Sequence, residues 1–480
     1  NIADNIYKNN PNKSDDELKK LIVDALRNIT FNSGRGYYFI YENSGKNILL
    51  PHNKELEGKD FWNHQDAKGS YIIKDMTALL SKSNEAFYEW YWYNPTNRDV
   101  QRKKIGLVRN FEQFGWFIGT GEYLEDFEKE VQEKVLKNIV DIYPKADIFS
   151  LVDFLSTKDR DEILKGKFAK TSFIQNLPFS KKHFRNYLPL FPKAIEILDL
   201  SSYDLIISSS WAVAKGIKKS KNQLHICYCH TPIRYAWDLY DEYTSNLKNP
   251  KKFFVEKTLG YIRKWDIRTL NRVDYFIANS KFVQERIKKT YKKDSVVIYP
   301  PVKTDKFRLN LKKDDFYLTA CRLVPYKKTK LIVEAFNEMS DKKLVVIGSG
   351  EEFLSIKSIA KENIVLLGFK EEKELIKYMQ EAKAFLYAAI EDFGIVPIEA
   401  LSCGTPVIAL NQGGTAETIR DGISGVHFQN QTKEDIVDAV RRFEKIDFSY
   451  ETVSDEAKKY NENRFKKEFE DFVNLKLINK

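Results

Sequence analysis

The chain has 480 residues, of which 42% are apolar and 30% are charged, and its formal net charge is +10. This length is too great for one hydrophobic core, so two or three domains are expected. There is no run of about 18 apolar residues, which excludes a transmembrane helix of the usual kind, and there is no secretory signal peptide. The chain begins with Asn1 rather than methionine, as expected of a fragment.

The positive charge is concentrated in lysine clusters such as residues 218–221 and 292–293. Such clusters are most often solvated surface, and the functional alternative is peripheral contact with the anionic headgroups of a membrane. Nucleic acid is the weaker alternative, and we predict no nucleic-acid partner, because no DNA- or RNA-binding motif accompanies the clusters.

The four cysteines lie in or beside apolar runs, at positions 227, 229, 321 and 403. Cys227 and Cys229 lack the two-residue gap of redox and zinc motifs. Buried, reduced thiols are expected, and they favour a cytoplasmic protein, with peripheral contact to the inner membrane face as a further option.

The first 30 residues are predicted to be helical. Residues Ser14 to Glu17 have the pattern of a capping box, and apolar residues follow at helical spacing from Leu18 to Ile29. From Gly36 the pattern becomes strand-like and rich in Tyr and Phe. The predicted elements are a hairpin that turns at residues 43–45, strands over 86–95, 103–111 and 116–124, and an amphipathic helix from Leu124 to about Ile139.

This order of a helix, an aromatic-rich antiparallel sheet and a closing helix resembles the Cache sensor domains of bacterial receptors. The resemblance covers residues 18–133 and is carried by residues 34–39, 57–59 and 119–123. It implies an α+β, PAS-like fold with an aromatic pocket for a small metabolite, often a carboxylate. The residues predicted to line the pocket are Tyr38, Trp90, Trp92 and Arg109. The competing interpretation is a plain core, because aromatic residues commonly alternate on buried strands.

From Asp141 onward short apolar runs alternate with helical segments, as in a parallel sheet with crossover helices. Strands are predicted over 146–152, 203–208, 224–229, 273–280 and 295–302, with loops and short helices over 171–192 and a long helix over 251–271. This part is expected to form a first doubly wound domain that ends near Val302.

A second doubly wound domain is predicted from Phe316. Its strands are expected near 316–320, 344–348, 364–367, 384–388, 406–409 and 425–428. The helices between and after them are expected over 328–339, 351–361, 371–382, 395–403, 414–420 and 433–444, with a final helix over 455–474.

The most informative stretch runs from Tyr387 to Gly414 and reads YAAIEDFGIVPIEALSCGTPVIALNQGG. Glu391 falls on a turn after a predicted strand, and Glu399 falls inside the next helix. Ligands of open parallel sheets bind outside the carboxyl ends of the strands, so both carboxylates are expected to face one crevice. A bare pair of this spacing is a weak signal, because glutamate is common on helix surfaces, but the context of 28 residues is specific.

The pattern Glu-x7-Glu, with Phe393-Gly394-Ile395 and residues 404–407, resembles the donor-site signature of retaining glycosyltransferase family 4. The resemblance covers about 135–475 and implies the α/β GT-B fold, a pair of Rossmann-like doubly wound domains. It implies transfer of a hexose from a nucleoside diphosphate sugar to a glycan or lipid-linked glycan acceptor, with retention and with no metal or other cofactor. The segment 230–238 resembles the mannosyltransferase-like branch that builds surface polysaccharides, which favours mannose.

Charged residues at the predicted strand ends suit such a donor. Arg322 and Lys327 follow a strand and stand five residues apart, so both cations can converge on a pyrophosphate, as they do in the family. The family resemblance assigns Glu399 to the ribose hydroxyls. It assigns Glu391 to the transferred sugar, whose hydroxyls are hydrogen-bond donors. The alternative for Arg322 is a packed interdomain salt bridge.

The remaining predicted site residues are backbone positions and one histidine. The resemblance assigns the backbone amides of Gly394 and Ile395 to the sugar hydroxyls. Gly348 and the pair Gly413-Gly414 are assigned to donor binding because they stand where strands give way to helices, although a mere tight turn is equally consistent for Gly348. His230 follows a strand of the first domain, and the resemblance places it against the donor sugar and phosphate. With Glu391 it forms the predicted catalytic pair, and the competing interpretation is a structural histidine.

One departure from the family pattern lies at the start of the first domain. The first strand and its Gly-rich loop are missing, and the Cache-like segment stands in their place. The predicted domains are therefore 1–133, an incomplete Rossmann-like domain over 134–302, and a nucleotide-sugar-binding domain over 303–480. We expect the first sheet to be split, with no strand from residues 1–140 restoring its centre.

The two resemblances also imply different compartments, because Cache domains usually lie outside the membrane and these transferases lie inside. A gene fusion or an artefact of sequence assembly would explain such a junction. The alternative function is a small-carboxylate sensor whose transferase half is non-functional.

Overall fold

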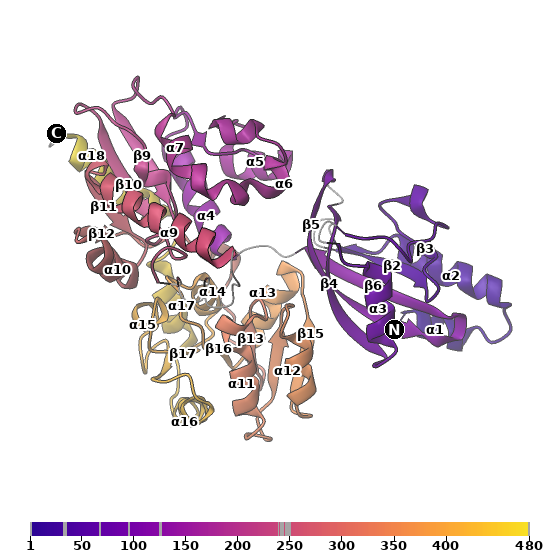
Figure 1. Cartoon of the computed structure of the whole chain (residues 1–480). Coiled ribbons are helices and arrows are strands. Elements are labelled where there is room, and N and C mark those ends of the chain that lie inside the picture. The colour runs from indigo at the N-terminus through magenta and orange to yellow at the C-terminus, as the bar shows by residue number, and fades with distance from the viewer. Residues whose placement is uncertain are drawn as a thin grey trace. The chain divides into compact units, whose positions relative to one another are not determined.

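The computed structural model describes residues 2–31, 36–66, 69–94, 97–123, 127–238, 240, 244 and 251–478 (Figure 1). The chain forms two compact units. The first comprises Asn1–Glu125 with Ser349–Ser358, and the second comprises Asp126–Gly348 with Ile359–Lys480. The domain boundaries predicted after residues 133 and 302 stay predictions, and helix α4 (Phe127–Ile142) runs without a break across the first of them.

The chain begins with two helices rather than one, α1 (Ile2–Asn9) and α2 (Asp15–Arg27). Pro11 explains the break, because a proline disfavours helical backbone in the residue before it. The predicted capping box is confirmed: the Ser14 hydroxyl accepts from the Glu17 amide, and the Glu17 carboxylate accepts from the Ser14 amide at 2.9 Å.

An antiparallel sheet with the order β1-β2-β6-β5-β4 forms the centre of the first unit, and β3 also pairs with β2. The strands are β1 (Thr30–Phe31), β2 (Gly36–Glu42), β3 (Asn47–Leu49), β4 (Glu85–Asn94), β5 (Asn97–Phe111) and β6 (Trp116–Tyr123). The short helices are η1 (Lys54–Leu56), α3 (Ile72–Leu80) and η2 (Glu112–Phe114). The predicted hairpin and strands are confirmed, and residues 34, 35, 95 and 124–126 of the predictions lie outside the described residues.

Side-chain alternation divides this sheet into two faces with separate cores. On one face Phe39, Trp90 and Val108 pack with α3. On the other face Ile40 and Phe111 pack with α2. A sheet covered by helices in this way is the α+β architecture that the sequence predicts.

The second unit begins with an incomplete parallel sheet. Four parallel strands have the order β12-β11-β10-β9, while β7 and β8 pair only with each other. The strands are β7 (Phe149–Ser150), β8 (Lys170–Thr171), β9 (Leu205–Ser210), β10 (Leu224–Cys229), β11 (Tyr275–Ala278) and β12 (Ser295–Val297). The helices are α4, α5 (Thr157–Leu164), η3 (Phe173–Asn176), α6 (Ser180–His183), η4 (Phe184–Leu190), α7 (Phe191–Glu196), η5 (Ala214–Gly216), α9 (Lys251–Arg268), η6 (Thr269–Arg272), α10 (Lys281–Tyr291) and η7 (Thr304–Lys306). We call the part with β7 to β12 the first half of this unit.

The predicted split of the first sheet is confirmed. In the order 3-2-1-4-5-6 the first strand lies between the second and the fourth, which here correspond to β7 and β9. No described strand occupies that place, and β9 pairs only with β10. The apolar side chains still meet across the break, since Phe149 and Tyr203 make an edge-to-face contact at 5.6 Å between ring centroids.

The second half of this unit has a complete parallel sheet with the order β15-β14-β13-β16-β17-β18. Its strands are β13 (Tyr317–Ala320), β14 (Leu344–Ile347), β15 (Ile364–Gly368), β16 (Ala384–Tyr387), β17 (Val407–Leu410) and β18 (Gly425–Phe428). The helices are η8 (Pro325–Lys327), α11 (Thr329–Phe336), α13 (Glu372–Glu381), α14 (Ile395–Ser402), α15 (Thr415–Thr418), α16 (Lys433–Phe443), α17 (Tyr450–Lys458) and α18 (Glu462–Ile478). Helix α12 (Phe353–Ile359) also follows β14 in the chain, but all of it except Ile359 is grouped with the first unit. This is the order 3-2-1-4-5-6 of a Rossmann fold, and the predicted strands are confirmed.

The single final helix predicted over 455–474 is instead two helices, α17 and α18. The break lies at Asn461, whose side-chain oxygen caps the start of α18 by accepting a hydrogen bond from the Arg464 amide at 2.7 Å. Helix α18 then returns to the first half, where Phe465 and Phe469 pack against Ile226 of β10 (Figure 1). In the described part of the chain, no helix is both long enough and apolar enough to span a bilayer.

Candidate functional site

The order of the second sheet reverses between β13 and β16, which are direct neighbours. A crevice forms at such a switch point, outside the carboxyl ends of the two strands. Arg322 and Lys327 follow β13, and Glu391 follows β16. The topology therefore brings the predicted cations and one predicted carboxylate to the same end of the sheet.

Lys327, Glu391 and Tyr387 form a hydrogen-bonded cluster at this point. The Lys327 ammonium donates to the Glu391 carboxylate and, at 3.1 Å, to the Tyr387 hydroxyl, which itself donates to Glu391. The Lys327 side chain is only 3% exposed. Burial alone lowers the pKa of Lys327, but its neighbours Tyr387 and Glu391 raise it well above the ordinary value, so the site keeps a fixed positive charge.

Arg322 contributes a second cation whose hydrogen-bonding capacity is not fully used. Its Nε atom is buried, and within the described ranges no acceptor lies within hydrogen-bonding distance of it. A buried donor of this kind costs free energy unless a partner arrives. The interdomain salt bridge considered as the alternative for Arg322 is not seen among the described residues, and its role in donor binding stays a prediction.

Three predicted glycines shape the turns around the crevice. Gly413, with φ +70°, and Gly414 lie against the Glu391–Phe393 turn, and the Gly414 amide donates to the Glu391 carbonyl at 2.8 Å. A Cβ atom on Gly414 would stand 2.1 Å from the Phe393 carbonyl oxygen. On Gly348 it would stand 1.9 Å from the Cys321 carbonyl oxygen. Each of these three glycines therefore permits a close approach of two backbones.

Gly394 and Ile395 begin helix α14. Gly394 is the residue before the helix and has φ +80°, and no side chain caps the first turn. The amide groups at the start of a helix lack partners inside the helix, so they are available to ligand oxygens. This arrangement fits the predicted contact with sugar hydroxyls, and the assignment itself stays a prediction.

Glu399 lies inside α14 and is buried. Its Oε1 accepts a hydrogen bond from Lys134 of α4 at 3.1 Å, so the carboxylate belongs to an ion pair that joins the two halves. The structure thus places Glu399 at the contact between α14 and α4. The prediction that it shares one cleft wall with Arg322, Lys327 and Glu391, opposite His230, stays a prediction.

His230 follows β10 in the first half and is buried. Its Nε2 atom is 2.8 Å from the Ser209 hydroxyl, and its Nδ1 atom has no hydrogen-bond partner in the described residues. Burial lowers the pKa of His230 to about 3, so the ring is neutral at physiological pH. A neutral imidazole with one unused nitrogen can accept from, or donate to, a ligand hydroxyl.

The sequence reasoning missed a group of contacts between the two halves. Arg286 of α10 donates to Asp392 at 2.5 Å and also pairs with Asp238. The Glu417 carboxylate accepts from the Lys281 amide at 2.9 Å, at the start of the same helix. Burial raises the pKa of Asp392, and Arg286 opposes this effect. Pairs this far apart in the chain leave no local pattern, and only the position of Asp392 beside Glu391 could have drawn attention to it.

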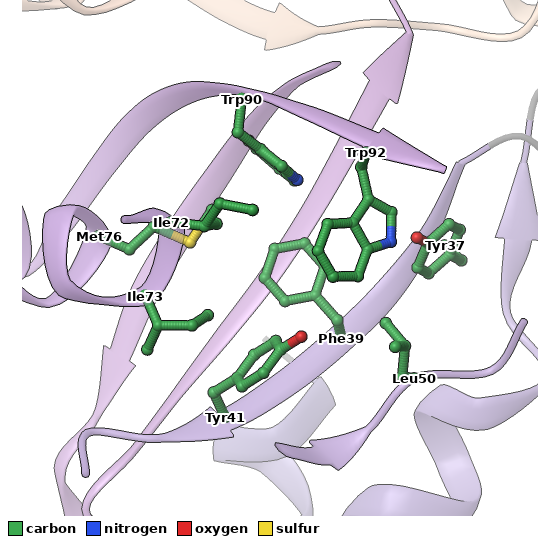
Figure 2. A pocket seen from close by; sticks show the side chains of 9 residues that line it. All are labelled: Tyr37, Phe39, Tyr41, Leu50, Ile72, Ile73, Met76, Trp90 and Trp92. Atoms are coloured by element: carbon green, nitrogen blue, oxygen red, sulfur yellow. The ribbon is translucent and has the colours of Figure 1, made fainter. Parts of the chain in front are cut away.

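The first unit holds a second candidate site, a small apolar pocket (Figure 2). The residues that line it are Tyr37, Phe39, Tyr41, Leu50, Ile72, Ile73, Met76, Trp90 and Trp92. The cavity has a volume of about 10 Å³, which is room for roughly one water molecule. Trp90 and Trp92, which were predicted for the sensor pocket, line this cavity, and their rings point into it in Figure 2. That the cavity is a ligand site stays a prediction.

The prediction that Tyr38 and Arg109 line this pocket is wrong. Successive residues of a strand point to opposite faces of the sheet. Tyr38 follows the pocket residue Tyr37 and packs in the core on the other face. Arg109 follows Val108, whose side chain belongs to the pocket-side core, so Arg109 also faces away.

The cation on the pocket side is Lys104, which the sequence analysis did not select. Its side chain is fully buried, and its Nζ lies 3.7 Å from the centroid of the Tyr37 ring and 5.7 Å from that of Trp90. Both rings belong to the pocket lining. The spacing could have identified Lys104, because it stands two and four positions before Gly106 and Val108 on the same face of β5.

Three family descriptions match successive parts of the chain. Residues 1–147 match the Cache domain, residues 152–306 match Glycosyltransferase Family 4, and residues 301–464 match Glycosyl transferases group 1.

Individual relatives agree with these matches. An uncharacterized glycosyltransferase of Methanocaldococcus jannaschii is 27% identical over 35% of this chain and 48% of its own length. The alpha-1,3/1,6-mannosyltransferase ALG2 of Dictyostelium discoideum is 26% identical over 50% of this chain and 66% of its own length. The chain therefore spans about half to two thirds of these relatives.

A solved structure shares the fold of the second unit. The lipopolysaccharide outer core galactosyltransferase WaaB, in its apo form, superimposes with a TM-score of 0.51 at 17% identity, over 72% of this chain and 96% of that one. This likeness concerns the fold alone. It agrees with two Rossmann-like halves in the second unit, the first of which lacks a strand here.

Proposed function

Because the chain joins a Cache domain to a glycosyltransferase of the GT-B type, we propose that it transfers a hexose from a nucleoside diphosphate sugar to a glycan or lipid-linked glycan. The observation that carries the proposal is the fixed cation Lys327 beside Arg322 at the switch point of the second sheet. Mannose is the proposed sugar, since ALG2 is named a mannosyltransferase and the segment 230–238 resembles that branch.

The departing diphosphate is the group that Arg322 and Lys327 are proposed to bind. Arg322 has a buried Nε donor with no hydrogen-bond partner among the described residues, and Lys327 has a fixed charge close to the end of β13. Preorganised cations stabilise negative charge as it develops on a leaving group. Glu391 holds Lys327 in place before the donor binds, and its carboxylate can then accept from the hydroxyls of the sugar.

The sugar and ribose are assigned to the remaining residues. The amide groups at the start of α14 are proposed to donate to the transferred sugar, and Glu399 to accept from the ribose. His230 is proposed to contact the sugar and phosphate through its unused nitrogen. No carboxylate is assigned as a nucleophile, so we propose retention by attack of the acceptor on the face that the diphosphate leaves. We propose that no metal takes part.

The test is a donor screen in which the full chain is incubated with GDP-mannose, UDP-glucose and related donors, and transfer products are detected by mass. Calorimetry with GDP and UDP gives binding separately from turnover, and NMR of the product gives the anomeric configuration. Binding of at least one nucleoside diphosphate supports the donor site. A chain that binds neither GDP nor UDP contradicts it, and an inverted product contradicts retention.

Lys104 supports a second binding function, recognition of a small carboxylate by the Cache domain. A buried ammonium beside two aromatic rings provides a charge partner for an anion in an apolar pocket. The cavity is small, so the ligand must widen it on entry. Calorimetry with acetate, propionate and pyruvate should show binding that Lys104→Met abolishes. Arg109→Met is the matched control, because Arg109 lies on the other face. Equal loss in both variants contradicts the assignment.

Contact with an anionic membrane is proposed for helix α9. Phe253 and Phe254 are exposed, Phe254 by 66%, and the Lys257 ammonium lies 4.6 Å from the Phe253 ring centroid. Exposed aromatic residues beside lysines suit the interface of an anionic bilayer, where we place the transfer reaction on the cytoplasmic side. Binding to vesicles that contain phosphatidylglycerol, lost in Phe253→Ser/Phe254→Ser, supports this contact. Equal binding to neutral vesicles contradicts it.

A further inference from the structure

Helix α4 contacts both halves of the second unit. Val135 and Ile139 pack in the core of the first half, against β10 and α18. One turn earlier, Val131 packs against the core of the second half. Further ties fix the helix: Asn138 donates to Glu462 of α18 at 3.2 Å, and Asp141 pairs with Lys466 at 2.7 Å.

Lys134 lies between these contacts and reaches α14. Its Nζ is 3.1 Å from the Glu399 Oε1, and the two side chains are 13% and 9% exposed. Because α4 is held on both sides of Lys134, this ammonium has little freedom to move away. The pair is the contact through which the first half reaches the carboxylate assigned to the ribose.

A buried charged group such as the Glu399 carboxylate costs free energy unless a partner compensates it, and the Lys134 ammonium is such a partner. A carboxylate has about four acceptor positions, so one carboxylate can accept from an ammonium and from hydroxyl groups at the same time. Lys134 is therefore compatible with a bound ribose and fixes the direction of the carboxylate.

We propose that Lys134 is a positioning residue of the donor site, which holds the Glu399 carboxylate oriented toward the ribose hydroxyls of the nucleotide. This inference rests on the proposed function, since it takes Glu399 as the acceptor of those hydroxyls. It also makes ribose recognition dependent on the first half, although Glu399 itself belongs to the second. Lys134 acts through Glu399 and has no direct part in the transfer step.

The experiment measures the affinity of the full chain for GDP and UDP and for their 2′-deoxy and 3′-deoxy analogues by calorimetry. Wild type should prefer the ribonucleotides. Lys134→Gln should weaken ribonucleotide binding about tenfold, the effect of one charge-assisted hydrogen bond, and should leave deoxynucleotide binding nearly unchanged. The preference should therefore fall toward one. A purely structural defect would weaken all nucleotides alike.

Two further variants make the result specific. Lys137→Gln removes the same charge from the same helix, one turn later, and should keep the ribose preference, because the described residues show no ion pair at Lys137. Lys134→Gln/Glu399→Gln should match Glu399→Gln alone, since Lys134 acts through Glu399. This double variant also removes the unpaired charge, so it tests the inference if the single variant is unstable.

Each outcome has a separate meaning. An unchanged ribose preference in Lys134→Gln, or an equal loss for ribo- and deoxynucleotides, overturns the inference and leaves the donor site standing. Additive losses in the double variant also overturn it. If wild type binds no nucleoside diphosphate, the proposed function fails and this inference fails with it.

Discussion

The pair of Lys327 and Glu391 gives a prediction that does not depend on any ligand. Lys327→Met keeps most of the length of the side chain but removes the ammonium, with its bonds to Glu391 and Tyr387. Removing one partner of a buried pair costs about 3–5 kcal/mol. The Glu391 side chain is 22% exposed, so water can partly solvate it, and we expect the lower end of that range. The expected loss in the free energy of unfolding is about 3 kcal/mol.

Urea unfolding of the full chain, followed by circular dichroism, measures this loss. Lys330→Met is the matched control, since it makes the same substitution on α11, and it should cost less than about 0.5 kcal/mol. In the double variant Lys327→Met/Glu391→Gln the two costs should not add, with a coupling of roughly 1–3 kcal/mol. A Lys327→Met variant as stable as the control, or strictly additive costs, would refute the buried pair.

Three further outcomes follow from the same geometry. Arg322→Ala should weaken nucleoside diphosphate binding by roughly 2–5 kcal/mol in calorimetry. Arg441→Ala, on the exposed side of α16, is the control and should leave the affinity unchanged. Equal affinities of the wild type and Arg322→Ala would show that Arg322 does not bind the diphosphate. Gly414→Ala should destabilise the fold by more than Gly422→Ala, because a Cβ atom on Gly414 would clash with the Phe393 backbone. Gly422 has open space around it, so its substitution should cost only the roughly 1–2 kcal/mol of an L side chain at φ +73°. Equal unfolding free energies of the two variants would contradict the close contact at Gly414. Burial lowers the pKa of His225 to about 4 and of His230 to about 3, so below pH 6.5 the unfolded chain binds more protons than the folded chain. The contribution of these histidines to stability should be full above that pH, and below it the free energy of unfolding should fall by about 1.4 kcal/mol per pH unit for each histidine. His230→Asn should show a smaller slope, and an unchanged slope would contradict the assignment.

The second half of the second unit was the most predictable part of the chain. Its strands are short, wholly apolar runs such as 344–347 and 407–410, and turns or glycines separate them from amphipathic helices. A buried parallel strand leaves this trace in the sequence because both of its faces are covered. The places of Arg322, Lys327 and Glu391 then follow from the alternation of strands and helices.

Local patterns could not show which face of a strand or which distant partner a residue meets. Arg109 and Lys104 both lie on β5, a strand rich in charged residues, but their side chains point to opposite faces of the sheet. The sequence alone does not show which of the two faces is the pocket side. The pairing of Lys134 with Glu399 joins residues 265 positions apart, so no spacing indicates it. Such contacts are set by how two halves pack, which depends on many side chains together.

The split first sheet leads to the last prediction. Along β9 the edge away from β10 has no partner strand in the described residues, and the Gly-rich loop that the family places near the donor phosphates is missing with that strand. Amide groups of β9 should therefore exchange with solvent faster than those of β10, whose strand is paired on both sides.

The same gap should separate nucleotide binding from transfer. Arg322 and Lys327 belong to the complete second sheet, so a nucleoside diphosphate should still bind. Turnover should be low, because the loop that belongs beside the phosphates no longer stabilises the leaving group, and one such set of donors contributes about 10²–10³ in rate. Replacing residues 1–126 with a strand and Gly-rich loop of the pattern that the family resemblance implies should raise turnover at least tenfold with little change in nucleotide affinity. Deleting residues 1–126 should give no gain. Equal turnover in the natural and restored chains would mean that the missing strand has no catalytic importance here.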